Sequence, residues 1–155
     1  LTWREVGASI SAPVVMIVVT SLALGLALVE TGGATFIAQG FIGIFQIFPT
    51  PMILSGLMLV MALLTNVVSN NAAGVIGTPI AIQVARELGV SPEPFVLAVI
   101  FGANMSYATP FGYQTNLLLL SAGGYRFSDF IRAGIPLTIL MWLGFSIVLP
   151  LMYPL

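Results

Sequence analysis

The residues with the clearest capacity for chemistry lie in one stretch, TNVVSNNAAGVIGTP, which runs from Thr65 to Pro79. Three adjacent polar residues, Ser69, Asn70 and Asn71, follow directly after an apolar run. Hydroxyl and amide oxygens of this kind, together with backbone carbonyls, are ligands that hard cations such as sodium prefer. A helix expected to start near Asn71 would direct its N-terminus, with unpaired N–H groups, toward an anion.

A second polar cluster follows at residues 108–116, within the stretch NMSYATPFGYQTN. Pro110 removes a backbone donor and clashes with the preceding turn, and Gly112 weakens a helix further. The cluster therefore predicts a break in an otherwise apolar helix. Discontinuous helices at membrane depth are typical of the ion and substrate sites of secondary transporters.

Small polar residues in membrane helices also serve as packing contacts between helices. This is the favoured interpretation for any single Ser or Thr of the chain. It fails for Ser69, Asn70 and Asn71, because three adjacent side chains cannot all face one packing seam. The tripeptide therefore predicts a binding site rather than a packing contact.

The composition places both clusters in a membrane. Of the 155 residues, 59% are hydrophobic and 6% are charged, whereas roughly a quarter of a soluble domain is charged. No charge lies between Glu30 and Arg86, and none lies between Glu93 and Arg126. These intervals are long enough for helices of about 20 residues that cross a bilayer. We therefore expect an integral membrane protein.

The composition also excludes several classes of function. With no Cys and no His, the sequence cannot support thiol chemistry, disulfides, the usual zinc sites or His-based catalysis. It has no basic stripe of the kind that nucleic acid binding requires, so no nucleic acid partner is expected. A nucleophile with a base, or a paired set of Asp residues, is also missing from the pattern. We therefore predict that the chain is not an enzyme.

The apolar pattern predicts an all-α polytopic membrane protein. A first span is expected over residues 10–29 and a short interfacial or tilted helix over residues 34–48. Residues 52–90 are predicted to form a re-entrant helical hairpin, whose two apolar arms flank a polar tip inside the membrane. Irregular backbone at that depth must be buried in protein or line a cavity.

A discontinuous transmembrane helix is expected from Phe95 to Gly124, interrupted at the second polar cluster. A final span is expected over residues 133–153. The chain is therefore divided into a scaffold-type span with an interfacial helix (1–51), the hairpin (52–90), and the broken helix with the final transmembrane helix (91–155).

The first residues, LTWREV, do not begin with Met and resemble the middle of a protein. We expect the chain to be a fragment, one half of a longer transporter whose N-terminal half is missing. The expected location is a cell membrane, most simply a bacterial inner membrane, which the chain crosses more than once.

The motif SNNAA, followed by ATPFGYQTNLLLLSAGGYRFSDFIRAGIPL, resembles the second half of a divalent anion:sodium symporter (the DASS family). The resemblance runs from Trp3 to the C-terminus. It implies one half of an inverted repeat, with substrate held between two hairpin tips and Na⁺ as the coupling ion. It also implies a homodimer in the lipid bilayer and an elevator mechanism, in which residues up to about 51 belong largely to the scaffold.

The resemblance further implies roles for individual residues. Substrate binding would fall to the tip tripeptide and the Thr-Pro break: Ser69, Asn70, Asn71, Thr109 and Pro110. Sodium binding would involve side chains of the tip and one carbonyl of the break: Thr65, Ser69, Asn70 and Ala108. Asn71 stands where members of the family usually carry Thr, and FGYQTN resembles the sulfate-type branch rather than the dicarboxylate members. Sulfate is therefore the expected divalent anion.

Other interpretations stay open at this stage. A related carrier of the same superfamily could move a dicarboxylate, citrate, arsenite or another ion, or could exchange anions without sodium. A membrane assembly or anchor segment without transport is a different class. Such a segment would need no pair of polar helix breaks, so substitutions at the two clusters would then be silent.

Overall fold

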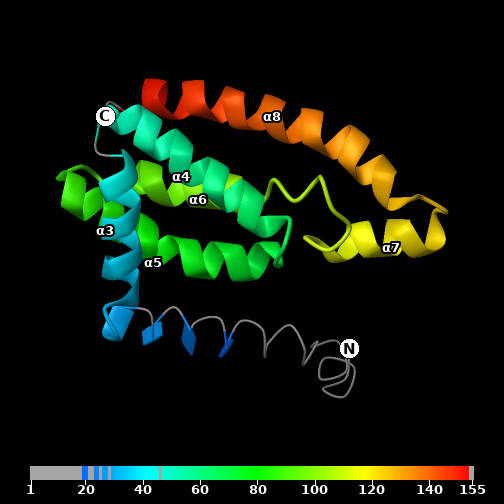
Figure 1. Ribbon diagram of the computed structural model, residues 1–155, viewed down its shortest axis with the longest axis horizontal. Helices are drawn as coiled ribbons and strands as arrows, with labels where there is room; N and C mark the ends of the chain where they lie inside the picture. The colour runs from blue at the N-terminus through cyan, green and yellow to red at the C-terminus, as the bar shows by residue number, and fades with distance from the viewer. Residues whose placement is uncertain (1–18, 21–22, 25, 28, 46, 154–155) are drawn as a thin grey trace, which may run out of the picture.

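The computed structural model describes residues 19–20, 23–24, 26–27, 29–45 and 47–153 (Figure 1). Across this part of the chain the regular structure is helical and no strand occurs, which confirms the predicted all-α fold. The helices, in chain order, are α3 (Gly33–Phe45), α4 (Thr50–Thr65), α5 (Asn70–Leu88), α6 (Glu93–Ala103), α7 (Gln114–Ala122) and α8 (Phe127–Met152).

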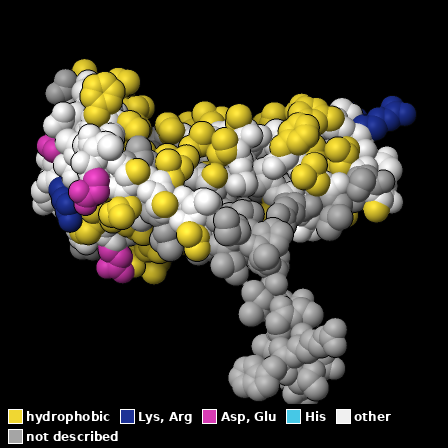
Figure 2. Space-filling model, turned by 90° about the horizontal axis from the view of Figure 1, so that it is seen from below, with side chains coloured by type: hydrophobic (Ala, Val, Ile, Leu, Met, Phe, Trp, Pro, Cys, Tyr) yellow, Lys and Arg dark blue, Asp and Glu magenta, His cyan; other side chains and the backbone are white. Residues whose placement is uncertain are grey.

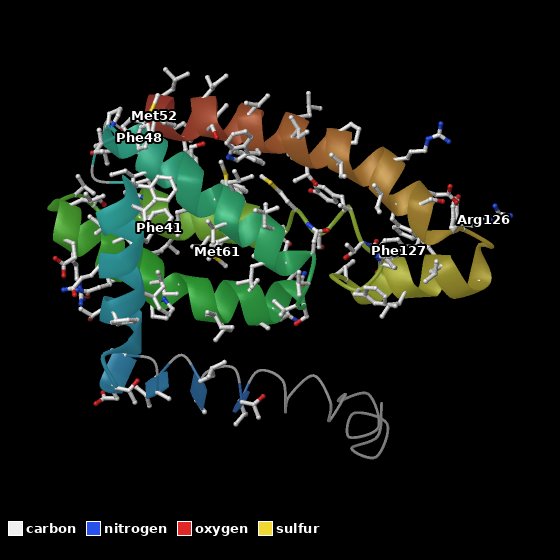
Figure 3. All side chains as sticks on the ribbon, viewed as in Figure 1. Phe41, Phe48, Met52, Met61, Arg126 and Phe127 are labelled. Atoms are coloured by element: carbon white, nitrogen blue, oxygen red, sulfur yellow. The ribbon has the colours of Figure 1, made fainter. Side chains whose placement is uncertain are left out.

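Helices α4, α5 and α6 pack against one another and form the core. The core is built from apolar and small side chains, including Leu54 and Met58 of α4, Ala81 of α5, and Phe95 and Ala98 of α6, each fully buried. Figure 3 places Met61 of α4 within this group. Small side chains allow helix backbones to approach closely, as they do in membrane proteins generally.

Local sequence signals explain where the helices of the hairpin begin and end. Pro51 lies in the first turn of α4, where its missing N–H costs nothing. Ser69 is the N-cap of α5. Gly89 ends α5 with a φ of 69°, a left-handed conformation that glycine adopts without steric cost. The two antiparallel arms, α4 and α5, thus form a helical hairpin with residues 66–69 at its tip.

Helix α8 is long and apolar enough to cross a membrane, with 26 residues and a mean hydropathy of 2.1 over its most apolar window. Only 6% of that window is buried. Polar contacts attach it to α4: the Ser55 and Ser146 hydroxyls lie 2.7 Å apart, and the Trp142 indole N–H donates to the Ser55 carbonyl at 3.0 Å. The exposed apolar face of α8 suits contact with lipid.

Among the described residues, charged side chains stay away from the middle of the molecule. In the view of Figure 2 they gather at the two ends of the long axis, with hydrophobic side chains between them. Figure 3 shows Arg126 at one end, at the turn between α7 and α8. At the other end the Tyr153 hydroxyl donates to Glu93 at 3.0 Å. This hydrogen bond to the carboxylate raises the pKa of Tyr153 above its ordinary value.

The predicted elements correspond to the helices as follows. The first span, residues 10–29, lies largely outside the described residues. The interfacial segment forms α3, the hairpin forms α4 and α5, and the final span forms α8, which starts earlier than expected, at Phe127. The broken helix forms α6 and α7, with a non-helical break over residues 104–113. Re-entry of the hairpin into the membrane and the division into scaffold and transport unit stay predictions.

Candidate functional site

The hairpin tip is organised by its own polar side chains. The Ser69 hydroxyl accepts a hydrogen bond from the Ala72 N–H at 3.3 Å, as an N-cap serine does. The Asn70 side-chain oxygen accepts one from the Asn71 N–H at 2.8 Å. The Asn70 N–H donates to the carbonyl of Gly112, in the break, at 3.2 Å. The first N–H groups of α5 therefore all have protein partners in this structure, which the prediction of an open helix N-terminus did not foresee.

The tip is fastened to the end of α6 by a buried hydrogen bond. The Thr65 hydroxyl, which is 0% exposed, donates to the Ala103 carbonyl at 2.7 Å. Its oxygen keeps lone pairs that a cation could use. Residues at the ends of α4 and α6 are thus held together, although they are 38 positions apart in the chain.

Asn66 connects the tip to the break itself. Its side-chain oxygen accepts hydrogen bonds from the N–H groups of Ala108 at 3.0 Å and Thr109 at 3.1 Å. Its backbone carbonyl accepts one from the Thr109 hydroxyl at 2.7 Å, and its side-chain nitrogen donates to the Met105 carbonyl at 3.1 Å. Sequence reasoning missed Asn66, although an amide directly after Thr65 at the end of an apolar helix was an available signal.

Gly112 allows the break to approach the tip closely. It is buried, and a Cβ atom at this position would clash with the backbone carbonyl of Thr65 and come within 2.7 Å of the Ser106 Cβ. Any side chain here would push the break away from α4. The glycine of FGYQTN thus has a packing role in addition to its effect on helix stability.

A polar pocket of about 310 Å³ lies between the tip and the break. Its lining residues come from the tip, from the break and from the first turn of α7: Asn70, Asn104, Ser106, Tyr107, Tyr113 and Asn116. Asn116 shapes this lining, because its side-chain nitrogen donates to the carbonyls of Ser106 at 2.8 Å and Thr109 at 3.2 Å.

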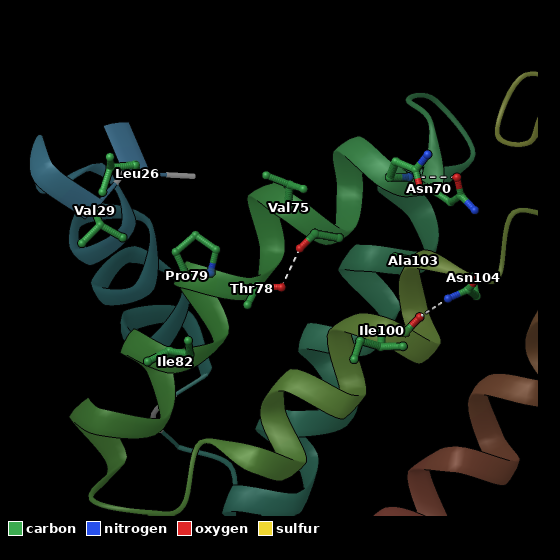
Figure 4. Close-up of a pocket in the computed structure, with 12 residues that line it drawn as sticks. Leu26, Val29, Asn70, Val75, Thr78, Pro79, Ile82, Ile100, Ala103 and Asn104 are labelled. Carbon is green, nitrogen blue, oxygen red and sulfur yellow. Dashed lines mark hydrogen bonds between the residues drawn. The ribbon is translucent and has the colours of Figure 1, made fainter. Parts of the chain in front are cut away.

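A larger pocket of about 620 Å³ is also lined by Asn70 and lies between α5, α6 and residues near the start of the described chain. Figure 4 shows Asn70 and Asn104 at one end of it and Leu26 and Val29 at the other. Most of its lining is apolar, and Asn71 is one of its few polar residues. The smaller pocket has the denser polar chemistry and is the better candidate for a charged ligand.

The structure brings the two predicted clusters together. Thr65, Ser69, Asn70 and Asn71 lie at or beside the tip, and Ala108 and Thr109 are bonded to it through Asn66. Only Asn70 of the predicted site residues lines the polar pocket. The Thr109 hydroxyl and N–H both point to Asn66, and Pro110 is fully buried. Tyr113 and Asn116 fall within the predicted polar cluster at residues 108–116 but were given no role of their own. The remaining lining residues, Asn104, Ser106 and Tyr107, lie before that cluster and were not predicted to form the site.

Comparison with known proteins identifies the family. The family model described as "Citrate transporter" (CitMHS) matches residues 1–155. The chain is 48% identical to an uncharacterized transporter, sll0640, of Synechocystis over 92 residues, which is 59% of this chain and 15% of the relative. It is 33% identical to the uncharacterized transporter YfbS of Escherichia coli over 146 residues, which is 94% of this chain and 24% of the relative.

A further relative is named for its substrates. The chain is 32% identical to sodium/sulfate cotransporter 1 of Chlamydomonas reinhardtii over 138 residues, which is 87% of this chain and 16% of that protein. The chain therefore spans less than a quarter of the length of each of these three relatives. Because the family model covers every residue, this chain belongs to the citrate transporter family of membrane transporters, and its resemblance to the divalent anion:sodium symporters is confirmed.

Proposed function

We propose that this chain is part of a sodium-coupled transporter of a divalent anion, and that the anion is sulfate. The observation that carries the proposal is the docking of the hairpin tip onto the helix break, which leaves a polar pocket at their junction. The names of the Chlamydomonas sodium/sulfate cotransporters 1 and 2 support both the ion and the substrate.

The pocket offers neutral donors to an anion. Four polar groups of its lining residues make no hydrogen bond within the described part of the chain: the Asn70 amide nitrogen and the hydroxyls of Ser106, Tyr107 and Tyr113. The N-terminus of α5 adds its positive dipole end at Asn70. A dianion cannot leave water without such compensation. Since the N–H groups of the first turn are occupied, we assign direct substrate contact to side chains, with Asn70 as the central one.

The same junction offers oxygen ligands to sodium. Thr65, Ser69 and Asn70 contribute hydroxyl and amide oxygens, and Ala108 contributes a backbone carbonyl. Such a neutral oxygen set suits a hard monovalent cation at a helix break. A sodium ion here would lie beside the anion pocket and offset part of the charge of the substrate. Asn71, Thr109 and Pro110 would then shape the site rather than line the polar pocket.

The rest of the mechanism is proposed from the family resemblance. The transporter would be a homodimer in a bacterial inner membrane, and an N-terminal half of the same protein would supply a second hairpin tip. The hairpin (52–90), the broken helix and α8 would move together as an elevator against the segment up to residue 51. The hydrogen bonds that join the tip to the break support their moving as one body.

Citrate transport is the second candidate, because the matching family model is described as a citrate transporter. Citrate carries more charge and volume than sulfate and would need donors beyond those of one small pocket. Exchange of anions without sodium is a third candidate. The uptake assay described next distinguishes it from sodium-coupled transport.

The test uses the full-length protein in proteoliposomes. Uptake of radiolabelled sulfate is measured with an inward sodium gradient and with potassium in its place, for the wild type and for Asn70→Ala. We expect sodium-dependent uptake that falls at least roughly tenfold on substitution, as expected when a hydrogen bond to a charged ligand is lost. Sodium-dependent uptake of citrate or succinate but not of sulfate would overturn the substrate. Uptake that ignores sodium would overturn the coupling.

A further inference from the structure

We propose that Asn66 is a positioning residue that aims the Ala108 carbonyl at the sodium site. The inference rests on the proposed function, because it gives that carbonyl the role of a sodium ligand. Asn66 itself lines neither of the two pockets described above. Its effect on transport would therefore be exerted through the break.

Asn66 sets the direction of one peptide group of the break. The described residues contain no cis peptide bond, so the N–H of Thr109 and the carbonyl of Ala108 point in opposite directions from the same trans peptide. The Thr109 N–H points to the Asn66 side-chain oxygen at 3.1 Å. The Ala108 carbonyl must therefore point away from Asn66. A rotation of that peptide would break the bond to Asn66, so the amide oxygen fixes the direction of the carbonyl.

The side-chain amide of Asn66 uses all of its hydrogen-bonding positions. Its oxygen accepts from two N–H groups, those of Ala108 and Thr109. Its nitrogen donates to two carbonyls, those of Ala62 at 2.7 Å and Met105 at 3.1 Å. Only a carboxamide combines two acceptor and two donor positions on so short a side chain. The partners also determine which atom is oxygen, because a flipped amide would place N–H against N–H.

Capping of α4 does not require this set of four hydrogen bonds. A bond from the Asn66 side-chain nitrogen to the Ala62 carbonyl would suffice to cap the helix end. The contacts to Met105, Ala108 and Thr109 reach residues 39 to 43 positions away. Without Asn66, two N–H groups that directly precede Pro110 would lose their partner in a partly buried site, which is unfavourable.

The experiment compares three variants of the full-length protein. Asn66→Leu removes every side-chain hydrogen bond at similar volume, and Asn66→Asp keeps both acceptor contacts. Thr31→Val is the matched control, because it removes a side-chain bond to the Ala27 carbonyl in the segment before α3, and Thr31 lines neither pocket. Two quantities are measured: amide hydrogen exchange at residues 104–113, and the sodium concentration that gives half-maximal sulfate uptake, with rates normalised to monodisperse protein.

We expect Asn66→Leu to raise exchange at Ala108 and Thr109 at least roughly tenfold, because their acceptor is lost. The half-maximal sodium concentration should rise by a similar factor, whereas Thr31→Val should leave both quantities unchanged. Asn66→Asp should retain the protection of the two N–H groups. A merely structural role would lower the amount of folded protein without changing the sodium dependence.

The inference would be overturned if Asn66→Leu had the same amide exchange and the same half-maximal sodium concentration as the wild type. Faster exchange with unchanged sodium dependence would also overturn it, since the carbonyl would then not serve the ion. If Asn66→Leu does not yield monodisperse protein, Asn66→Asp decides: retained protection together with a near-wild-type half-maximal sodium concentration supports the inference, and loss of either overturns it. Absence of sodium-dependent sulfate uptake in the wild type would instead overturn the proposed function. The proposal that the Ala108 carbonyl binds sodium would then fail as well. The exchange data would still show whether Asn66 holds the break.

Discussion

The ends of α4 and α6 make an instructive comparison. Each helix ends at an asparagine, Asn66 or Asn104, whose side-chain nitrogen donates to the carbonyl four residues earlier. The distances are 2.7 Å to Ala62 and 2.8 Å to Ile100. Locally, the two side chains are alike, because each donates to a carbonyl of the last helical turn, although the Ile100 carbonyl also accepts from the Asn104 N–H.

Their surroundings make the two asparagines different. Asn66 is partly buried and its side-chain oxygen holds two N–H groups of the break. Asn104 is exposed and lines both pockets. Asn66 therefore holds the tip and the break together, whereas the side chain of Asn104 is available to a ligand. The comparison teaches that residue type and local geometry do not by themselves separate a structural amide from a binding amide.

The largest loss of stability and uptake is expected from a substitution where the break meets the end of α4. Gly112→Ala would place a Cβ atom against the Thr65 carbonyl. Overpacking of this kind costs about 1–3 kcal/mol, and we expect a lower melting temperature together with loss of sodium-dependent uptake. The matched control is Gly40→Ala in α3, where a Cβ atom would meet nothing within 4 Å. If the two variants have the same melting temperature, the break does not lie as close to the Thr65 carbonyl as the structure indicates.

An intermediate loss of stability is expected when the hydrogen bond that joins the ends of α4 and α6 is removed. Thr65→Val removes the buried hydroxyl that donates to the Ala103 carbonyl at 2.7 Å. The loss should lower the free energy of unfolding by about 1–3 kcal/mol, measured by thermal or denaturant unfolding in detergent. Thr65→Ser keeps the hydroxyl and should restore most of the stability and the sodium dependence. A stable Thr65→Val protein with normal sodium dependence would contradict both roles of this side chain.

The smallest effect on stability is expected at Asn104, the C-cap of α6. Asn104→Ala removes an exposed hydrogen bond to the Ile100 carbonyl, and exposed substitutions usually change stability by about 0.5 kcal/mol or less. Its effect should instead appear as a several-fold rise in the sulfate concentration for half-maximal uptake, because Asn104 lines the polar pocket. An Asn104→Ala protein destabilised as much as Asn66→Leu would remove the distinction between the two caps.

Much of the fold could be predicted because its signals are local. Ser69 caps α5, Gly89 ends it, and the cluster around Pro110 interrupts the helix, each as the residue types suggest. The candidate site was less predictable. Asn70 was expected in it, but the tyrosines and Ser106 that line the pocket were not, because their roles depend on what the fold places opposite them.

Asn66 is the clearest case of a residue that sequence reasoning could not interpret. Its partners, Ala108 and Thr109, lie 42 and 43 positions away. No periodic pattern links residues at such a separation, since helical periodicity and capping act over only a few residues. The same limit explains why the first N–H groups of α5 were expected to be free, although the Gly112 carbonyl occupies one of them.

The sequence by itself determined that the protein is helical and apolar, and that polar groups interrupt it at two places. These properties follow from composition, burial periodicity and the stereochemistry of Pro, Gly and Ser, which all act locally. Only the tertiary structure decided that the two interruptions meet, and which of their polar groups pair and which face a pocket. The physical reason is that a hydrogen bond between distant residues depends on how closely the backbones approach, and here Gly112 and the small side chains of the core permit that approach.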